Sequence, residues 1–292
     1  IRLIVPTPAG AAPDLAARIV GDKLSRALGQ AVVIENRPGA GGIVAMNALK
    51  AAPNDGYTIA LAQAAVVVVT PFTYKEATYE VERDFETFAM AGKTPMLFVT
   101  NATNPAKNLA DVIATAKARP GELAVGNPTR TSIPHLASEL VGIKNNVKFN
   151  QVSFANTGQG IQAVVNGDIA VYVDGAGPLI QLVKSGRLRA LAIAAETELP
   201  GMEGIPLANK TVPGLNVNGW FSMQAPKGTP TAIMQRLNTE INAAMAQPDV
   251  VSKFNEFGMY ATPGTMADAQ KFVKSEVDQF GGVIRSVGLK PE

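Results

Sequence analysis

The chain has 292 residues, 47% of them hydrophobic, which is enough for one large domain or two medium domains with apolar cores. Its formal net charge is +2, with 26 Lys and Arg against 24 Asp and Glu, so we expect no nucleic-acid partner. Because it has no cysteine and one histidine, disulfides, thiolate metal sites and multi-histidine metal sites are excluded, and we expect neither a metal nor a cofactor.

The chain opens with a predicted strand, turn and helix. A mostly apolar run at residues 1–5 ends at Pro6, which cannot donate a hydrogen bond to a sheet. After a turn of small residues at 7–13, we expect a helix that ends at Gly29. The residues expected on its buried face recur at near-helical spacing: Leu15, Ile19, Leu24 and Leu28. A chain that starts directly on a core strand fits the removal of a secretion signal.

The start of this helix is a candidate anion site. Pro13 suits a first helical position, but Ala12 before it has no side-chain oxygen to cap the N–H groups of the first turn. Uncapped N–H groups behind a turn of small residues can bind an anion. The alternative is an ordinary strand-to-helix turn solvated by water.

Strand-like runs alternate with helix-length segments along the whole chain, which predicts an α/β protein with largely parallel sheets. Strands are expected at residues 31–34, 58–61, 88–91, 96–99, 123–125, 169–173 and 188–194. Helices are expected at residues 42–51, 109–118, 133–141, 160–166, 178–184, 231–246, 248–257 and 266–287.

Polar breaks at 99–105 and 224–230 predict two lobes. Lobe 1 would be discontinuous, made of residues 1–99 and 225–292, and lobe 2 would be an insertion at 100–224. Two such lobes, joined by two hinge crossings, can close on a ligand.

Turns in the middle of the chain follow predicted strands and lead into helices at 126–132, 153–158 and 174–177. Ligands of open α/β sheets bind where such turns collect. Arg130 can hold a carboxylate through its guanidinium, although a solvated surface arginine is the alternative. Asp174 could orient a ligand group, bind a water or cap the next helix, and we favour capping.

Other motifs indicate packing rather than chemistry. A dyad of Ser132 and His135 lacks a nucleophile elbow and an evident orienting acid, so a surface histidine is favoured. Residues 37–42 resemble a phosphate loop but lack its Gly-Lys-Ser/Thr ending, which favours a tight turn. We expect Trp220 and Phe221 to pack at a hinge.

Several runs together resemble the Bug-type receptors, the extracytoplasmic solute-binding proteins of tripartite tricarboxylate transporters. They are Asn36-Arg37-Pro38-Gly39-Ala40-Gly41-Gly42, Pro53-Asn54-Asp55-Gly56-Tyr57-Thr58 and the segments 1–18, 135–140, 186–192, 225–230 and 288–291. The resemblance implies a periplasmic, type II-like binding protein of two α/β lobes that closes over a small carboxylate. It would deliver this ligand to membrane permease subunits, and we expect it to be a monomer and not an enzyme.

In this family the first strand-to-helix turn holds a ligand carboxylate, and the turn before the histidine helps to close the site. Carried over by position, these turns are residues 7–14 and 127–132. Together with the turns described above, they give the expected ligand-binding residues: Thr7, Ala9, Gly10, Ala11, Ala12, Asp14, Asn127, Arg130, Thr131, Ser132, Phe154, Asn156, Thr157 and Asp174.

The chain departs from the family pattern at both turns. Relatives often have two glycines and a small hydroxyl residue where this chain has Gly10-Ala11-Ala12-Pro13, and a small or amide side chain where it has Arg130. An added cation fits a second ligand carboxylate, so we predict a dicarboxylate, with an aromatic one such as terephthalate ahead of an aliphatic one. The alternative functions are an enzyme on the same scaffold and a ligand-sensing co-receptor for a membrane kinase.

Overall fold

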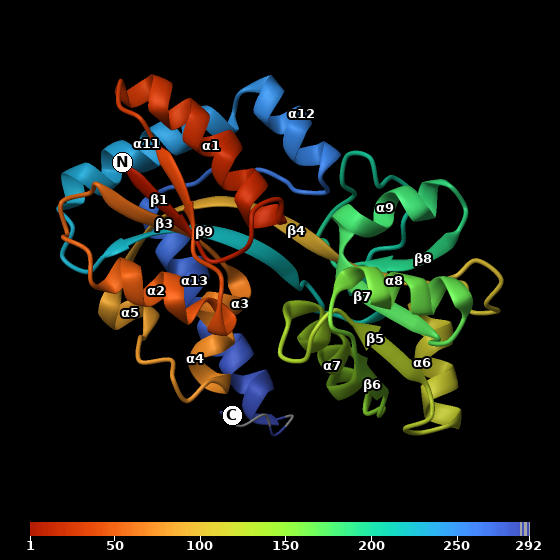
Figure 1. Ribbon diagram of the computed structural model, residues 1–292. Helices are drawn as coiled ribbons and strands as arrows, with labels where there is room; N and C mark the ends of the chain where they lie inside the picture. The colour runs from red at the N-terminus through yellow and green to blue at the C-terminus, as the bar shows by residue number, and fades with distance from the viewer. Residues whose placement is uncertain (287, 289–290, 292) are drawn as a thin grey trace. The chain divides into compact units, whose positions relative to one another are not determined.

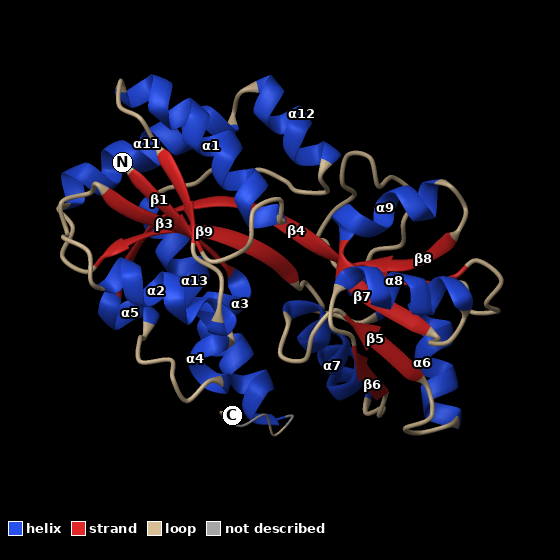
Figure 2. Ribbon diagram, in the orientation of Figure 1, coloured by secondary structure: helices blue, strands red, loops and turns tan. Residues whose placement is uncertain are grey.

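The computed structural model describes residues 1–286, 288 and 291, and the chain divides into two compact units. Unit 1 comprises Ile1–Lys93, Trp220–Phe254 and Tyr260–Glu292, and unit 2 comprises Thr94–Gly219 and Asn255–Met259. Each unit combines strands with helices, as the α/β prediction required (Figure 2).

The sheet of unit 1 has the strand order β2, β1, β3, β9, β4. Their bounds are β1 Arg2–Val5, β2 Val33–Asn36, β3 Thr58–Gln63, β4 Phe85–Asn101 and β9 Asn218–Pro226, of which β4 and β9 continue into unit 2. β1 pairs in parallel with β2 and β3, whereas β9 runs antiparallel to β3. The side chains Leu3, Ile4 and Val5 of β1 are fully buried, because helices cover both faces of the sheet.

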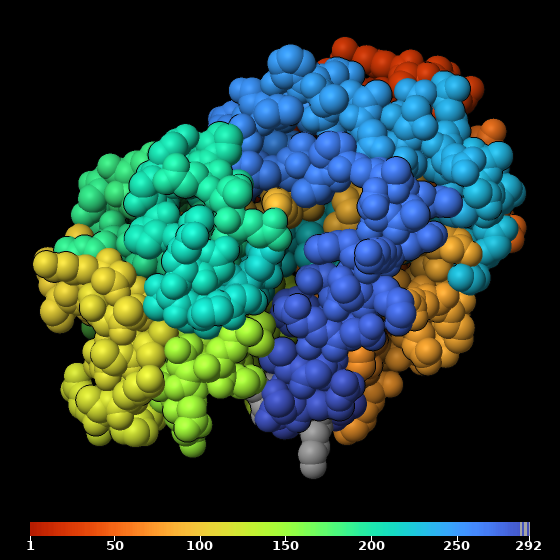
Figure 3. Space-filling view, turned by 180° about the vertical axis from the view of Figure 1, so that it is seen from behind, coloured from red at the N-terminus to blue at the C-terminus, as the bar shows by residue number. Residues whose placement is uncertain are grey.

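Helices cover both faces of this sheet, α1 and α11 on one side and α2, α3 and α13 on the other (Figure 1). The helices of unit 1 are α1 Ala12–Leu28, the 3-10 turn η1 Ala40–Gly42, α2 Ile43–Lys50, α3 Ala64–Val68, α4 Thr70–Thr73, α5 Val81–Asp84, α11 Thr231–Met245, α12 Pro248–Glu256 and α13 Met266–Ser286. The outer side of α13 forms part of the surface of unit 1 (Figure 3).

Unit 2 contains the end of β4 together with β5 Ala124–Asn127, β6 Asn150–Ser153, β7 Val171–Gly175 and β8 Leu188–Ile193. β5 is parallel to β6 and β7, and β4 is antiparallel to β7 and β8, so the sheets are less uniformly parallel than predicted. Its helices are α6 Leu109–Ala118, α7 Ile133–Asn145, α8 Thr157–Asn166, α9 Ala176–Lys184 and α10 Ala208–Thr211.

The buried face of α1 differs from the predicted one. Ala16, Ala17, Val20 and Leu24 are fully buried, whereas the other predicted core residues of this helix are only half-buried. The reason is close packing on the sheet, since a Cβ added at Gly21 would lie 3.0 Å from a side-chain carbon of Ile34. A helix that approaches a sheet this closely places its small residues against it.

The strand predictions were wrong where the chain bends and where a strand contains both polar and apolar residues. The strands expected at 88–91 and 96–99 are one strand, β4, which passes through Gly92 at a φ of +140°. β6 and β9 were not predicted, and the end of β9 lies in the segment interpreted as a polar break. The expected end of the last helix at Val287, and Leu289 and Lys290 of the family motif, lie outside the described residues.

Trp220 packs in the interior of unit 1. Its side chain is fully buried, its indole Nε1 donates to Glu276 at 2.8 Å, and its ring meets Phe272 edge-on. Burial raises the pKa of Glu276, and the indole hydrogen bond offsets part of that rise. No helix within the described residues has the length and apolar character required to span a bilayer.

Candidate ligand-binding turns

The first strand-to-helix turn lies in unit 1 at the carboxyl end of β1. α1 starts without a side-chain cap, because the capping position is Ala11. The first N–H groups of a helix have no partner within the helix, and the helix dipole is positive at this end. Gly10 takes a φ of +86° inside the turn, a backbone conformation that suits glycine. The result is a short turn of small residues with backbone donors at its end.

The carboxylate of Asp14 stabilises this turn through hydrogen bonds. Its side chain is 1% exposed and its carboxylate accepts hydrogen bonds from the Gly10 N–H at 2.8 Å, from Arg18 Nε at 2.9 Å and from Asn36 Nδ2 at 2.9 Å. Asn36 Nδ2 also donates to the carbonyl of Thr7 at 3.0 Å. The Asp14 carboxylate is therefore directed into the protein and holds the turn in shape.

The charge of Asp14 is compensated locally. Burial by itself raises the pKa of Asp14, but the hydrogen bonds from Arg18, Gly10 and Asn36 outweigh burial and bring the pKa below its ordinary value. Asp14 is thus ionised at neutral pH and forms an ion pair with Arg18. An anion at this turn would meet backbone dipoles rather than an unpaired carboxylate.

Thr7 places a hydroxyl in the same turn. Among the described residues, its Oγ1 is buried and has no hydrogen-bond partner. Buried polar atoms are nearly always hydrogen-bonded, so a hydroxyl of this kind marks a position where a further group can bind. Thr7, Ala9, Gly10 and Ala11 lie between β1 and α1, whereas Ala12 and Asp14 lie in the first turn of α1.

In unit 2, the turn at 127–132 joins β5 to α7. Asn127 is fully buried, and its Oδ1 accepts a hydrogen bond from Ser153 Oγ at 2.9 Å, whereas its Nδ2 has no partner in the described part of the chain. Ser132 caps α7 by accepting from the His135 N–H at 3.3 Å. Thr131 has a φ of +65°, which is unfavourable for a β-branched residue and is typical of functional turns. Arg130, next to it, is exposed.

His135 is not the surface residue that we expected. It is 5% exposed, and its Nε2 lies 3.5 Å from Glu139 Oε1. The Ser132 hydroxyl donates to the carbonyl of Thr129, so it does not form a dyad with the imidazole. The first turn of α7 packs against the sheet, which buries the histidine.

Asp174, at the end of β7, accepts hydrogen bonds from neighbouring donors. Its carboxylate accepts from Thr157 Oγ1 at 2.9 Å, from the Tyr172 hydroxyl at 3.1 Å and from the Gly175 N–H at 2.7 Å. The prediction that Asp174 caps the next helix was wrong, because α9 begins at Ala176 without a side-chain cap. Burial raises the pKa of Asp174, and these hydrogen bonds offset part of that rise.

The turns of unit 2 share one edge of its sheet. β5 is parallel to both β6 and β7, so the residues that follow these strands lie together. The Phe154 N–H donates to the carbonyl of Asn127 at 3.0 Å, and the Phe154 ring packs edge-on against Tyr172. Asn156 caps α8 through its hydrogen bond from the Gln159 N–H at 3.0 Å.

Sequence reasoning missed the residues that hold the turns in place. Asn36 was considered only as the first residue of a family motif, and Tyr172 as an ordinary strand residue. Asn36 lies just after the strand expected at 31–34, and because parallel strands end at the same edge of a sheet, this position is the signal that could have placed it near the turn at 7–14. No group of acidic and histidine side chains in the described residues is arranged to hold a metal ion.

The chain is similar to known proteins over most of its length. The model of the tripartite tricarboxylate transporter family receptor matches residues 16–289. The protein BugT of Bordetella pertussis is 31% identical over 292 residues, covering 99% of this chain and 90% of BugT. The structure of R. palustris Rpa4515 with adipate is 28% identical, with a TM-score of 0.85, and covers 100% of this chain and 98% of Rpa4515. MatC from Rhodopseudomonas palustris with bound malate is 26% identical, with a TM-score of 0.79, over 97% of this chain and 98% of MatC.

These similarities confirm the two-lobed α/β fold of a periplasmic binding protein and the prediction of a receptor rather than an enzyme. They also confirm the resemblance to Bug-type proteins. The chain therefore belongs to the receptor family of the tripartite tricarboxylate transporters, a family of periplasmic solute-binding proteins.

Proposed function

We propose that this receptor captures a small dicarboxylate and delivers it to the membrane permease of a tripartite tricarboxylate transporter. In this proposal the chain works in the periplasm as a monomer, and lobes at residues 1–99 with 225–292 and at 100–224 close over the ligand. The observation that carries it is the uncapped start of α1, where a turn held by Asp14 leaves backbone donors at the positive end of a helix.

One ligand carboxylate would bind at the turn of residues 7–14. Two features support this. The Thr7 hydroxyl is buried without a partner among the described residues, and Asp14 has its charge compensated by Arg18. Backbone N–H groups bind an anion without requiring a cationic side chain.

The second carboxylate would bind at the turn of residues 127–132. Arg130 can hold a carboxylate through a fork of N–H donors, and Thr131 and Ser132 lie beside it at the start of α7. The buried Nδ2 of Asn127 adds a neutral donor. Phe154, Asn156, Thr157 and Asp174 would line the same side of the ligand.

We favour an aliphatic ligand over an aromatic one, which changes the order predicted from the sequence. The similar structures of Rpa4515 and MatC were solved with adipate and malate, and both of these are aliphatic dicarboxylates. The Phe154 ring already packs against Tyr172, so it offers less free aromatic surface for stacking on terephthalate.

A thermal-shift screen tests the proposal. Succinate, malate, adipate and terephthalate are compared with their monocarboxylate counterparts, on the wild type and on Arg130→Ala. A ligand at a hundredfold excess over its Kd stabilises the protein by about 2.7 kcal/mol, which is readily measured. We expect a dicarboxylate to stabilise the wild type and to lose most of that effect in Arg130→Ala.

The control is Arg187→Ala, which removes another exposed arginine of unit 2. It should respond to ligands like the wild type. If monocarboxylates stabilise the protein equally well and Arg130→Ala responds like Arg187→Ala, the second-carboxylate assignment is wrong.

A further inference from the structure

The side chain of Asn36 forms hydrogen bonds to the turn that follows β1. Asn36 is the last residue of β2. Its Nδ2 donates to Asp14 Oδ1 at 2.9 Å and to the carbonyl of Thr7 at 3.0 Å, and its Oδ1 accepts from Arg18 Nη2 at 3.3 Å. One side chain therefore joins both ends of the turn.

We propose that Asn36 is the positioning residue of the anion-binding turn: acting through Asp14 and Thr7, it fixes the backbone conformation in which the start of α1 receives a ligand carboxylate. This inference rests on the proposed function and deepens it. Asn36 acts on the ligand through other residues and does not bind the ligand itself.

The chemistry of the contacts requires an amide side chain. A carboxamide carries two N–H donors and an acceptor oxygen, and all of these are used here, the donors on Asp14 and Thr7 and the acceptor on Arg18. An aspartate has no N–H to donate, and an alanine has neither donor nor acceptor. Either replacement leaves the carbonyl of Thr7 and one oxygen of Asp14 without this donor.

These contacts also determine which donors remain for a ligand. The Gly10 N–H is used by Asp14, and the Ala11 N–H points to the carbonyl of Pro8 at 3.4 Å. The N–H groups of the first helical turn, at Ala12 and Asp14, have no partner within the helix because of their position. Together with the Thr7 hydroxyl, they are the donors that a carboxylate would meet.

Replacing Asn36 with aspartate should weaken ligand binding in a way that depends on pH, which simple destabilisation of the fold would not do. A carboxylate at position 36 would face the carboxylate of Asp14, and two carboxylates in contact raise the pKa of one of them. The other charged groups nearby are Arg18 on α1, Arg2 on β1, and Glu35 and Arg37 on either side of Asn36, with Glu35 paired to both of these arginines. Protonation at lower pH returns an O–H donor, so the defect should lessen as the pH falls.

The test measures adipate binding by calorimetry for the wild type, Asn36→Asp and Asn47→Asp. Asn47 is exposed on α2 in the same unit, so Asn47→Asp carries the same chemical change outside the turn. We expect Asn36→Asp to bind adipate about tenfold to a hundredfold more weakly than Asn47→Asp at neutral pH. This ratio should shrink at about pH 5.5, and because both proteins are compared at one pH, protonation of adipate cancels.

Hydrogen exchange without ligand tests separately whether Asn36 positions the turn. Hydrogen exchange of the segment at 7–14 is compared between the wild type and Asn36→Ala, with Asn47→Ala as the control. In Asn36→Ala the hydrogen-bonded amides of this segment, those of Gly10 and Ala11, should exchange at least about tenfold faster while the rest of unit 1 keeps its protection.

The inference is overturned if the adipate affinity ratio stays near one, if the ratio does not change with pH, or if exchange at 7–14 is unchanged in Asn36→Ala. If the wild type itself does not bind adipate, the proposed ligand fails, whereas the exchange experiment still decides whether Asn36 positions the turn.

Discussion

At the scale of single residues, the buried carboxylates fall into two groups. Asp14 and Asp84 accept hydrogen bonds from cationic side chains, which keeps the pKa of each below its ordinary value. Asp174 is also buried but accepts, among the described residues, only from the neutral donors Thr157, Tyr172 and Gly175, so burial raises its pKa. The first pair stabilises unit 1 as ions, whereas Asp174 is poised to take up a proton as the pH falls.

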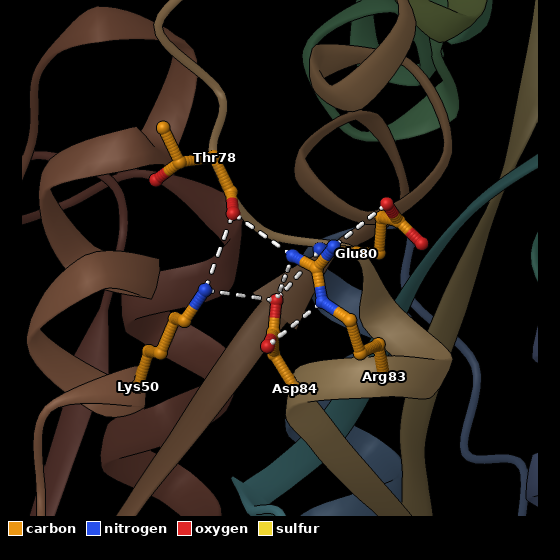
Figure 4. Close-up of polar contacts among 5 residues, drawn as sticks. All are labelled: Lys50, Thr78, Glu80, Arg83 and Asp84. Atoms are coloured by element: carbon orange, nitrogen blue, oxygen red, sulfur yellow. Dashed lines mark hydrogen bonds and ion pairs between the residues drawn. The ribbon is translucent and has the colours of Figure 1, made fainter.

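Asp84 gives the clearest test of the first group. Its carboxylate accepts from Arg83 Nη2 at 2.7 Å, from the Glu80 N–H at 2.9 Å and from Lys50 Nζ at 3.1 Å (Figure 4). Because the folded pKa is lowered from 3.8, the stabilisation is present above the unfolded value and is lost as the pH falls through the folded one. Asp84→Asn should lower the free energy of unfolding by about 1–3 kcal/mol at neutral pH, measured by urea denaturation.

The difference between the wild type and Asp84→Asn should shrink as the pH falls below about 4, because the unfolded wild type then takes up a proton at Asp84 that the folded protein does not. Asp22→Asn is the matched control, since Asp22 pairs with Arg26 on the exposed surface of α1. An exposed pair of this kind contributes about 0–1 kcal/mol. An equal loss in both variants, or a difference that does not depend on pH, would contradict this account of Asp84.

Asp174 predicts the opposite dependence on pH. Its folded pKa is raised from 3.8, so its ionisation costs stability, and the wild type becomes less stable relative to Asp174→Asn as the pH rises through the folded value. Urea denaturation of the two proteins across the acidic range measures this difference. A difference that grows in favour of the wild type with rising pH would mean that the hydrogen bonds from Thr157 and Tyr172 outweigh burial.

At the scale of elements, the sequence predicted what depends on local pattern. The helix at 109–118 and the end of α1 at Gly29 follow from apolar spacing and capping, and the structure has them. The helix predicted at 133–141 begins as expected but continues to Asn145, and α1 begins at Ala12, one residue before the predicted first position. The side of α1 that is buried depends on contact with Ile34, and the length of β4 depends on pairing with distant strands. The contacts of Asn36 with Thr7 and Asp14 also join segments far apart in the chain, so the local pattern could not reveal them.

Close packing of α8 on β7 gives a test at this scale. A Cβ added at Gly160 would lie 2.1 Å from a ring carbon of Tyr172 and 2.7 Å from its hydroxyl. Gly160→Ala should therefore destabilise the protein by about 1–3 kcal/mol and displace the hydrogen bond from Tyr172 to Asp174.

The control is Gly282→Ala, in the exposed part of α13, where an added Cβ would meet no atom of the described residues within 4 Å other than those of its own helix turn. Alanine is the better helix former, so this variant should be more stable by about 0.5–1 kcal/mol. Thermal denaturation of both variants decides the matter, and a Gly160→Ala protein as stable as the wild type would show that Tyr172 can move aside without cost.

At the scale of the whole molecule, family membership and the two turns support one account. Unit 1 provides a turn with neutral backbone donors, and unit 2 provides a turn that carries Arg130. In the proposed function, a ligand with a carboxylate at each end uses both turns, and binding energy favours the ligand-bound state of the receptor. Local sequence patterns do not specify the length and shape of that ligand.

The most direct measurement is a calorimetric cycle with adipate and hexanoate on the wild type and on Arg130→Ala. The two ligands have the same chain length, and hexanoate lacks one carboxylate. The account predicts that the wild type binds adipate at least about tenfold more tightly than hexanoate, and that this preference largely disappears in Arg130→Ala. Equal affinities in the wild type, or a preference that survives in Arg130→Ala, would contradict the assignment of Arg130 to a second carboxylate.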